Sequence, residues 1–157
     1  MNAFGHSVSR RRFIRLATVG GGVLASGLLA ACSNTPTGDG SPSIKILYPV
    51  QGAHVDGTRV SIQAEVKNWQ LVKANQPAQP SQGHLHLFID VPASSVAVGQ
   101  VIPTDKPQQY VHMGAPPFGS RTIELAPGVH TVTVVMGDSL HGMLDNPAPA
   151  SVTFVVG

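Results

Sequence analysis

Two histidines at alternate positions in an apolar run, His84 and His86 in "GHLHLFID", are the residues whose types and spacing most clearly suit chemistry. Side chains two positions apart on a strand share one face and lie roughly 7 Å apart at the backbone. Neutral imidazole is a good ligand for zinc or copper near pH 7, so such a pair can chelate one metal ion. The alternative is a pair of solvated or hydrogen-bonded histidines on a sheet face.

Two later segments offer partners for this pair. "YVHMG" contains His112, and "MGDSLHGM" contains Asp138 and His141. A thioether beside imidazole favours copper over zinc, and methionines flank both segments, although Met136 continues an apolar strand face and fits a core position better. We predict that copper, or else zinc, is bound by His84, His86, His112 and His141, with Asp90 and Asp138 as further candidate residues. His130 begins a strand face and is interpreted as structural, and His54 lies in a predicted turn without a visible partner.

The elements that carry these residues have period two. In the segment 83–90, Leu85, Leu87 and Ile89 share one face, which we expect to be the core face. His84, His86, Phe88 and Asp90 share the other face. "TRVSIQAEVKNW" alternates in the same way, and "VAVGQVIPTD" is a shorter apolar piece. Seven or eight short strands separated by turn signals predict an all-β, Ig-like antiparallel β-sandwich over residues 44–157.

The N-terminal part of the chain has the features of a targeting signal. "SRRRFIR", with Arg10 and Arg11, resembles a twin-arginine export signal, and a short glycine-rich apolar run follows it. The run ends in "LAAC", which resembles a bacterial lipobox with Cys32 as the lipidated residue. We therefore predict a cleaved signal peptide over residues 1–31 and a flexible linker over 32–43. The protein is expected to be exported and lipid-anchored in the cell envelope, on a periplasmic or extracellular face, with the membrane as its partner through Cys32 and an unknown protein partner.

Charge and composition exclude several functions. Four of the ten Lys and Arg residues lie in the predicted signal and all eight acidic residues follow it, so the remainder has six basic and eight acidic side chains. No basic patch remains for nucleic acid. No serine lies in a nucleophile elbow, and the carboxylates are scattered, so we expect no enzyme. Two functions stay open: a metal-binding module, and a cofactor-free binding or structural lipoprotein that recognises a protein, a glycan or a small molecule.

An ordered set of motifs carries a resemblance to a known family. "GHLHLFID", "IPTD", "VHMG", "TIELAPGVHTVTVVMGD", "LHGMLDNP" and "SVTFVV" occur in this order and resemble the bacterial domain of unknown function 4399, over residues 44–157. That family has a His-His-His-Leu-Leu-Ile-Asp strand, and this sequence departs from it at Leu85. The resemblance implies no activity. It draws attention to the matching positions His84, His86, Asp90, Asp105, His112, Gly128, His130, Asp138 and His141.

Overall fold

The structure is a computed structural model that describes residues 40–77 and 79–157. The predicted signal peptide, Cys32 and the linker up to residue 39 lie outside the described residues, so the predictions made for them stay predictions. Within the described part of the chain, no helix has the length and apolar character needed to cross a membrane. Residues 40–77 and 79–157 form one compact unit by their contacts.

The described residues form ten strands and one 3-10 helix, and three of the strands have only two residues. The strands follow from period-two segments such as Arg59–Lys67, in which buried Val60, Ile62 and Ala64 alternate with more exposed side chains. In chain order the elements are β1 (Ser43–Tyr48), β2 (His54–Val55), β3 (Arg59–Lys67), β4 (Gln70–Leu71), β5 (Gln82–Ile89), the 3-10 helix (Ala93–Ser95), β6 (Tyr110–Met113), β7 (Ser120–Glu124), β8 (Gly128–Gly137), β9 (Met143–Leu144) and β10 (Ala150–Val156).

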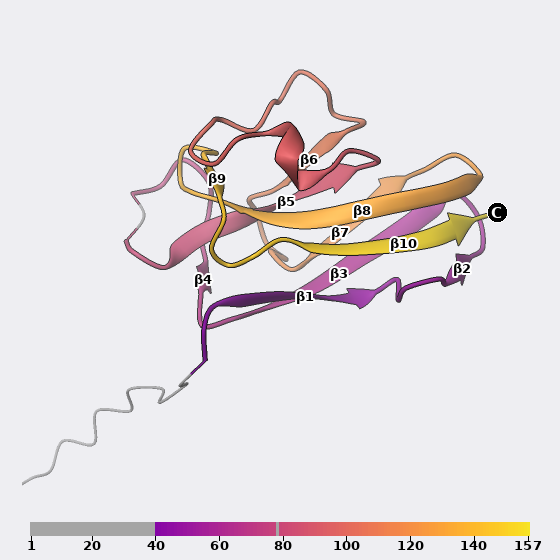
Figure 1. The fold of residues 1–157 in the computed structure, drawn as a ribbon, viewed down its shortest axis with the longest axis horizontal. Coiled ribbons are helices and arrows are strands. Elements are labelled where there is room, and N and C mark those ends of the chain that lie inside the picture. The colour runs from indigo at the N-terminus through magenta and orange to yellow at the C-terminus, as the bar shows by residue number, and fades with distance from the viewer. Residues whose placement is uncertain (1–39, 78) are drawn as a thin grey trace, which may run out of the picture. The chain divides into compact units, whose positions relative to one another are not determined.

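These strands build two sheets. One sheet has the order β1-β3-β7, and the other has the order β2-β10-β8-β5-β4, with β6 paired to β5 and β9 paired to β8. Pairing is antiparallel except between β2 and β10 and between β4 and β5. Figure 1 shows the two layers, with β8 and β10 in one and β1 and β3 in the other. The predicted all-β sandwich is confirmed, and the two-residue strands account for the larger strand count.

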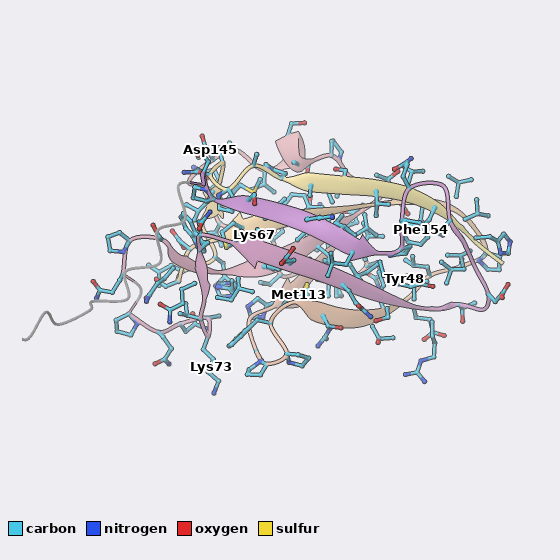
Figure 2. All side chains as sticks on the ribbon, turned by 90° about the horizontal axis from the view of Figure 1, so that it is seen from below. Tyr48, Lys67, Lys73, Met113, Asp145 and Phe154 are labelled. Carbon is cyan, nitrogen blue, oxygen red and sulfur yellow. The ribbon has the colours of Figure 1, made fainter. Side chains whose placement is uncertain are left out.

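The main core lies between the two sheets. Leu85, Leu87 and Ile89 of β5 belong to it, as the alternation predicts. Antiparallel pairing places Leu87 opposite Val134 and Ile89 opposite Val132, so β8 contributes the same face of the sheet. Figure 2 shows the side chains on the sandwich and labels Met113 and Phe154, two further members of this core. Met136 is fully buried here, which agrees with its interpretation as a core residue.

A second, smaller core covers the opposite face of β5 and β8. Phe88 and Val135 pack there against Val96, Ile102 and Met143, which come from the segment after the 3-10 helix and from β9. The apolar piece "VAVGQVIPTD" forms no strand: its backbone is hydrogen-bonded to residues 141–143, but the pairing amounts to one isolated bridge between Val101 and Gly142. Its role is to cover the sheet. As a result β5 is buried on both faces, and the outward-facing histidines are withdrawn from water.

Candidate metal centre

Four histidines from three parts of the chain meet on the covered outer face of the seven-stranded sheet. Each histidine offers one ring nitrogen, and these four nitrogens all lie within 4.8 Å of one another. The residues are His84, His86, His112 and His141. The separations between ring centroids run from 4.8 to 5.5 Å. We call these four residues the histidine cluster. The structure thus brings together all four histidines that the sequence singled out.

Strand register places three of the four rings. His84 and His86 alternate on β5, which puts both on the same face. On β6, His112 lies directly opposite His86 in the antiparallel ladder between β5 and β6. Residues opposite each other in such a ladder share a face and have Cβ atoms about 4.5–5.5 Å apart. The ring of His112 therefore joins the pair on β5, and it is the most exposed member of the cluster.

A tight turn after β8 supplies the fourth ring. The Oδ1 atom of Asp138 accepts hydrogen bonds from the backbone N–H groups of Leu140 and Gly142, both at 2.8 Å. The backbone N–H of Asp138 also donates to the carbonyl of Gly142 at 2.9 Å. His141 has a φ of 68°, a left-handed conformation that is uncommon for a residue with a side chain. Asp138 thus stabilises the turn that directs the His141 ring toward the sheet. It positions His141 and is not itself a member of the cluster.

Two glycines leave the space that the rings occupy. Gly137 is paired with His84 across the β5–β8 ladder, and a Cβ atom added to it would lie 3.0 Å from both Cδ2 and Nε2 of His86. A Cβ atom at Gly114 would overlap the Nε2 and Cε1 atoms of the His112 ring. Sequence reasoning missed both residues. The available signal was their position next to "VHM" and "VVM", where each glycine interrupts or ends an apolar strand.

Burial and the neighbouring rings favour the neutral form of three imidazoles in the cluster, those of His84, His86 and His112. Burial, followed by the neighbouring histidines, lowers the pKa of His84 to about 4, with Asp138 opposing the shift. Burial also lowers the pKa of His86, and the three other rings lower it further. For His112, burial lowers the pKa, and His141 and Arg121 act in the same direction. Neutral imidazoles present a lone pair instead of a second N–H, which is the state that a metal ion requires.

Within the described residues, hydrogen bonds do not pair every buried ring nitrogen of the cluster. The Nε2 atoms of His84 and His86 lie 3.0 Å apart, so one ring donates to the other when both are neutral. The Nδ1 atom of His84 is buried and has no hydrogen-bond partner. An unpaired buried polar atom costs about 1–3 kcal/mol. Two ligands on one tetrahedral metal ion lie about 3.3 Å apart, given metal–nitrogen distances of about 2.0–2.1 Å, so the spacing of the cluster suits a single ion.

The other sequence candidates lie outside the cluster. The His130 Nδ1 atom donates to Asp90 Oδ2 at 2.7 Å, and its Nε2 atom donates to the carbonyl of Ala126 at 2.8 Å. Burial alone would lower the pKa of His130, but these two hydrogen bonds outweigh it and raise the pKa. Asp90 also accepts from the backbone N–H of Thr131 at 2.8 Å. This pair joins the end of β5 to β8, which agrees with the structural interpretation of His130 and removes Asp90 from the candidate ligands. His54 lies in the two-residue strand β2, its exposed ring lies 3.5 Å from an Asp56 oxygen, and it is not a member of the histidine cluster.

Comparisons with known proteins give a family and two structural likenesses. The model of the family described as "Domain of unknown function (DUF4399)" matches residues 62–156. No protein with a curated description matches the chain. The chain is similar to fibronectin(III)-like modules of Clostridium thermocellum CbhA, with a TM-score of 0.42 and 12% identity over 72% of this chain and 94% of that one. It is also similar to an engineered protein, with a TM-score of 0.44 and 12% identity over 74% of this chain and 20% of that one.

Proposed function

The chain belongs to the DUF4399 family, and for this member we propose that the histidine cluster binds one transition-metal ion. One observation carries the proposal: four imidazole nitrogens from β5, β6 and the turn after β8 lie within 4.8 Å of one another. The observations are that the domain is a β-sandwich and that it contains this cluster. The bound ion is our inference from them.

Burial supports a ligand rather than a set of hydrogen-bonded histidines. His84 is fully buried and His86 is 2% exposed, so neither ring is solvated. Buried polar groups in folded proteins are nearly always paired, yet the Nδ1 atom of His84 has no partner in the part of the chain that the structure describes. Imidazole rings fill the space that the missing side chains of Gly114 and Gly137 leave. The rings are therefore held close together, although they would repel one another if they were protonated. A metal ion would replace the missing interactions with ligand bonds.

The donor set favours copper, with zinc second. All four candidate ligands are imidazoles, and divalent affinity for nitrogen sites rises along the first-row metals to a maximum at Cu²⁺. The methionines contribute less to this choice than the sequence suggested. Met113 and Met136 pack in the main core and Met143 packs in the second core. The preference for copper therefore rests on the affinity order of imidazole sites and not on thioether ligands.

The cellular setting of the proposal comes from the sequence. The motif with Arg10 and Arg11 and the "LAAC" sequence support export and a lipid anchor on Cys32, which would place the domain at the surface of a membrane. A rigid sandwich with a buried nitrogen site suits metal handling or sensing there, as a binding protein rather than an enzyme. Growth with a radiolabelled fatty acid tests the anchor. The label should enter the wild-type protein and be absent from Cys32→Ser, and label on both or on neither would reject the anchor.

Calorimetry tests the proposed function. The full chain with Cys32→Ser, which removes the single thiol, is stripped with a chelator, and Cu(II) and Zn(II) are titrated in a buffer that does not coordinate metals. We expect one ion per chain, with Cu(II) bound more tightly than Zn(II). His84→Ala and His86→Ala should each weaken binding by at least about tenfold, because outer-sphere changes alone typically cost about 10–100-fold.

The matched control is His54→Ala, which removes an exposed histidine outside the cluster. Its metal affinity should equal that of the parent chain. A dissociation constant weaker than about 10 μM, near −7 kcal/mol, would reject the site. Equal losses from His54→Ala and His84→Ala would show that copper binds surface histidines non-specifically. Either outcome would leave the cofactor-free binding lipoprotein as the better hypothesis.

A further inference from the structure

A groove runs along the edge of the sandwich between β6 and β7 and reaches the histidine cluster. Its volume is about 800 Å³, and its walls include His86, His112, Gly114 and Arg121. The two histidines come from the cluster, while Arg121 comes from the neighbouring sheet. The groove is therefore the route by which a small molecule in solvent can approach an ion held by the cluster.

Arg121 is a cation in this groove that forms no ion pair with a carboxylate of the described residues. It lies opposite Ile62 in the β3–β7 ladder, and Ile62 is fully buried in the main core. Opposite residues share a face, so Arg121 is on the side of β7 that looks toward the other sheet. None of the ion pairs among residues 40–77 and 79–157 includes it. Of the two carboxylates that line the groove, Asp90 is hydrogen-bonded to His130, and Glu124 is on the opposite face of β7 from Arg121.

Charge at the loaded site is unbalanced. A divalent ion with four neutral imidazoles would have a net charge of +2, and neither carboxylate that lines the groove, Asp90 or Glu124, is a member of the cluster. Arg121 adds a further positive charge in the groove that His112 also lines. Buried charge in a low-dielectric setting requires compensation. An anion that entered the groove would meet the ion and the guanidinium together.

We propose that the groove binds a small oxyanion, a carboxylate or a phosphate, between Arg121 and the metal ion of the histidine cluster. The guanidinium of Arg121 presents a planar fork of N–H donors that matches two oxygens of one such group. A phosphate would keep two oxygens on this fork and turn a third toward the metal ion from the side of His112, the most exposed ring of the cluster. A carboxylate, which has two oxygens, would place one on Arg121 and the other on the ion. The inference rests on the proposed metal site and adds a ligand class to it.

Optical titration of the copper-loaded chain tests the anion site. The full chain with Cys32→Ser is loaded with one equivalent of Cu(II), and acetate and inorganic phosphate are titrated in separate arms, with the visible absorption and electron paramagnetic resonance spectra recorded. We expect a saturable spectral change, and the arm with the lower dissociation constant identifies carboxylate or phosphate as the preferred class. Arg121→Gln should raise that constant by at least about tenfold, since a charge-assisted hydrogen bond contributes about that factor.

Two comparisons keep the result interpretable. Arg121→Gln should leave the Cu(II) affinity equal or slightly higher, because it removes a repulsive charge. Arg59 lies at the exposed end of β3 and outside the groove, so Arg59→Gln should change neither the Cu(II) affinity nor the anion affinity. Copper binding without a saturable response to either anion would overturn this inference alone. An equal anion affinity in Arg121→Gln and the parent would do the same. A chain that binds no copper rejects the proposed function and this inference with it.

Discussion

Replacing Gly114 by alanine should remove His112 from the cluster while the sandwich stays folded. A Cβ atom at this position would overlap the Nε2 and Cε1 atoms of His112, and it would lie 2.9 Å from the Cβ atom of Ala74. The imidazole is the end of a rotatable side chain and is the most exposed ring of the cluster, so it moves more easily than the backbone. Ala74 lies outside the strands and can shift slightly.

The magnitude follows from the size of the displacement. An ordinary contact begins near 3.4 Å, and the ring must move by about 1 Å or more to reach it. Ligand distances in metal sites vary by only about 0.2 Å, so His112 cannot remain a ligand after that movement. We expect a loss of Cu(II) affinity of at least about 10–100-fold, equal to the loss in His112→Ala. Overpacking against Ala74 should cost about 1–3 kcal/mol of unfolding free energy, which a folded domain of this size tolerates.

A double-mutant cycle is the assay. Cu(II) affinity is measured by calorimetry for the parent, Gly114→Ala, His112→Ala and the double variant, and urea unfolding verifies that each chain folds. If Gly114 acts only through His112, the second substitution costs nothing in the His112→Ala background. Gly157→Ala is the control, because its Cβ atom would make only an ordinary contact of 3.5 Å. Additive losses in the double variant, or full affinity in a folded Gly114→Ala, would refute the reasoning.

Three further predictions concern the turn and the titrating groups. Asp138→Ala should lower Cu(II) affinity by about 10–100-fold because the N–H groups of Leu140 and Gly142 lose their acceptor, and Asp138→Asn should restore most of it; equal affinities in both variants by calorimetry would contradict the positioning role. The apoprotein should be fully stable above pH 6.5 and lose stability as the pH falls toward 4, because the pKa of His84 is lowered to about 4 and the unfolded chain binds more protons in that window; urea midpoints that do not change there would oppose this. His130→Ala should cost about 1–2 kcal/mol below pH 6.5 and less as the pH rises through the raised pKa of His130, with copper affinity unchanged; a cost that does not vary with pH in urea unfolding would exclude a charged pair with Asp90.

Much of the fold was predictable because strand periodicity is a local property. The alternation in β5 assigns Leu85 and Leu87 to the core and His84 and His86 to the other face without any knowledge of neighbours. The same alternation could not show that the other face is buried. That depends on Phe88, Val96 and Ile102 meeting in a second core, in which the segment after the 3-10 helix folds over the sheet without forming a strand.

The sequence by itself determined which residue types are available to the site and on which face of their strands they lie. It placed two imidazoles on one face of β5 and supplied His112 and His141 further along the chain, and its ordered motifs indicated the family. Only the tertiary structure decided that the four rings meet. His112 reaches His86 through the β5–β6 register, and His141 reaches it through a left-handed turn held by Asp138. Contacts between residues distant along the chain arise from strand pairing and turn geometry, which local periodicity does not encode. The same limit applies to Gly114, Gly137 and Arg121, because free space and an unpaired charge are properties of the neighbours that folding brings together.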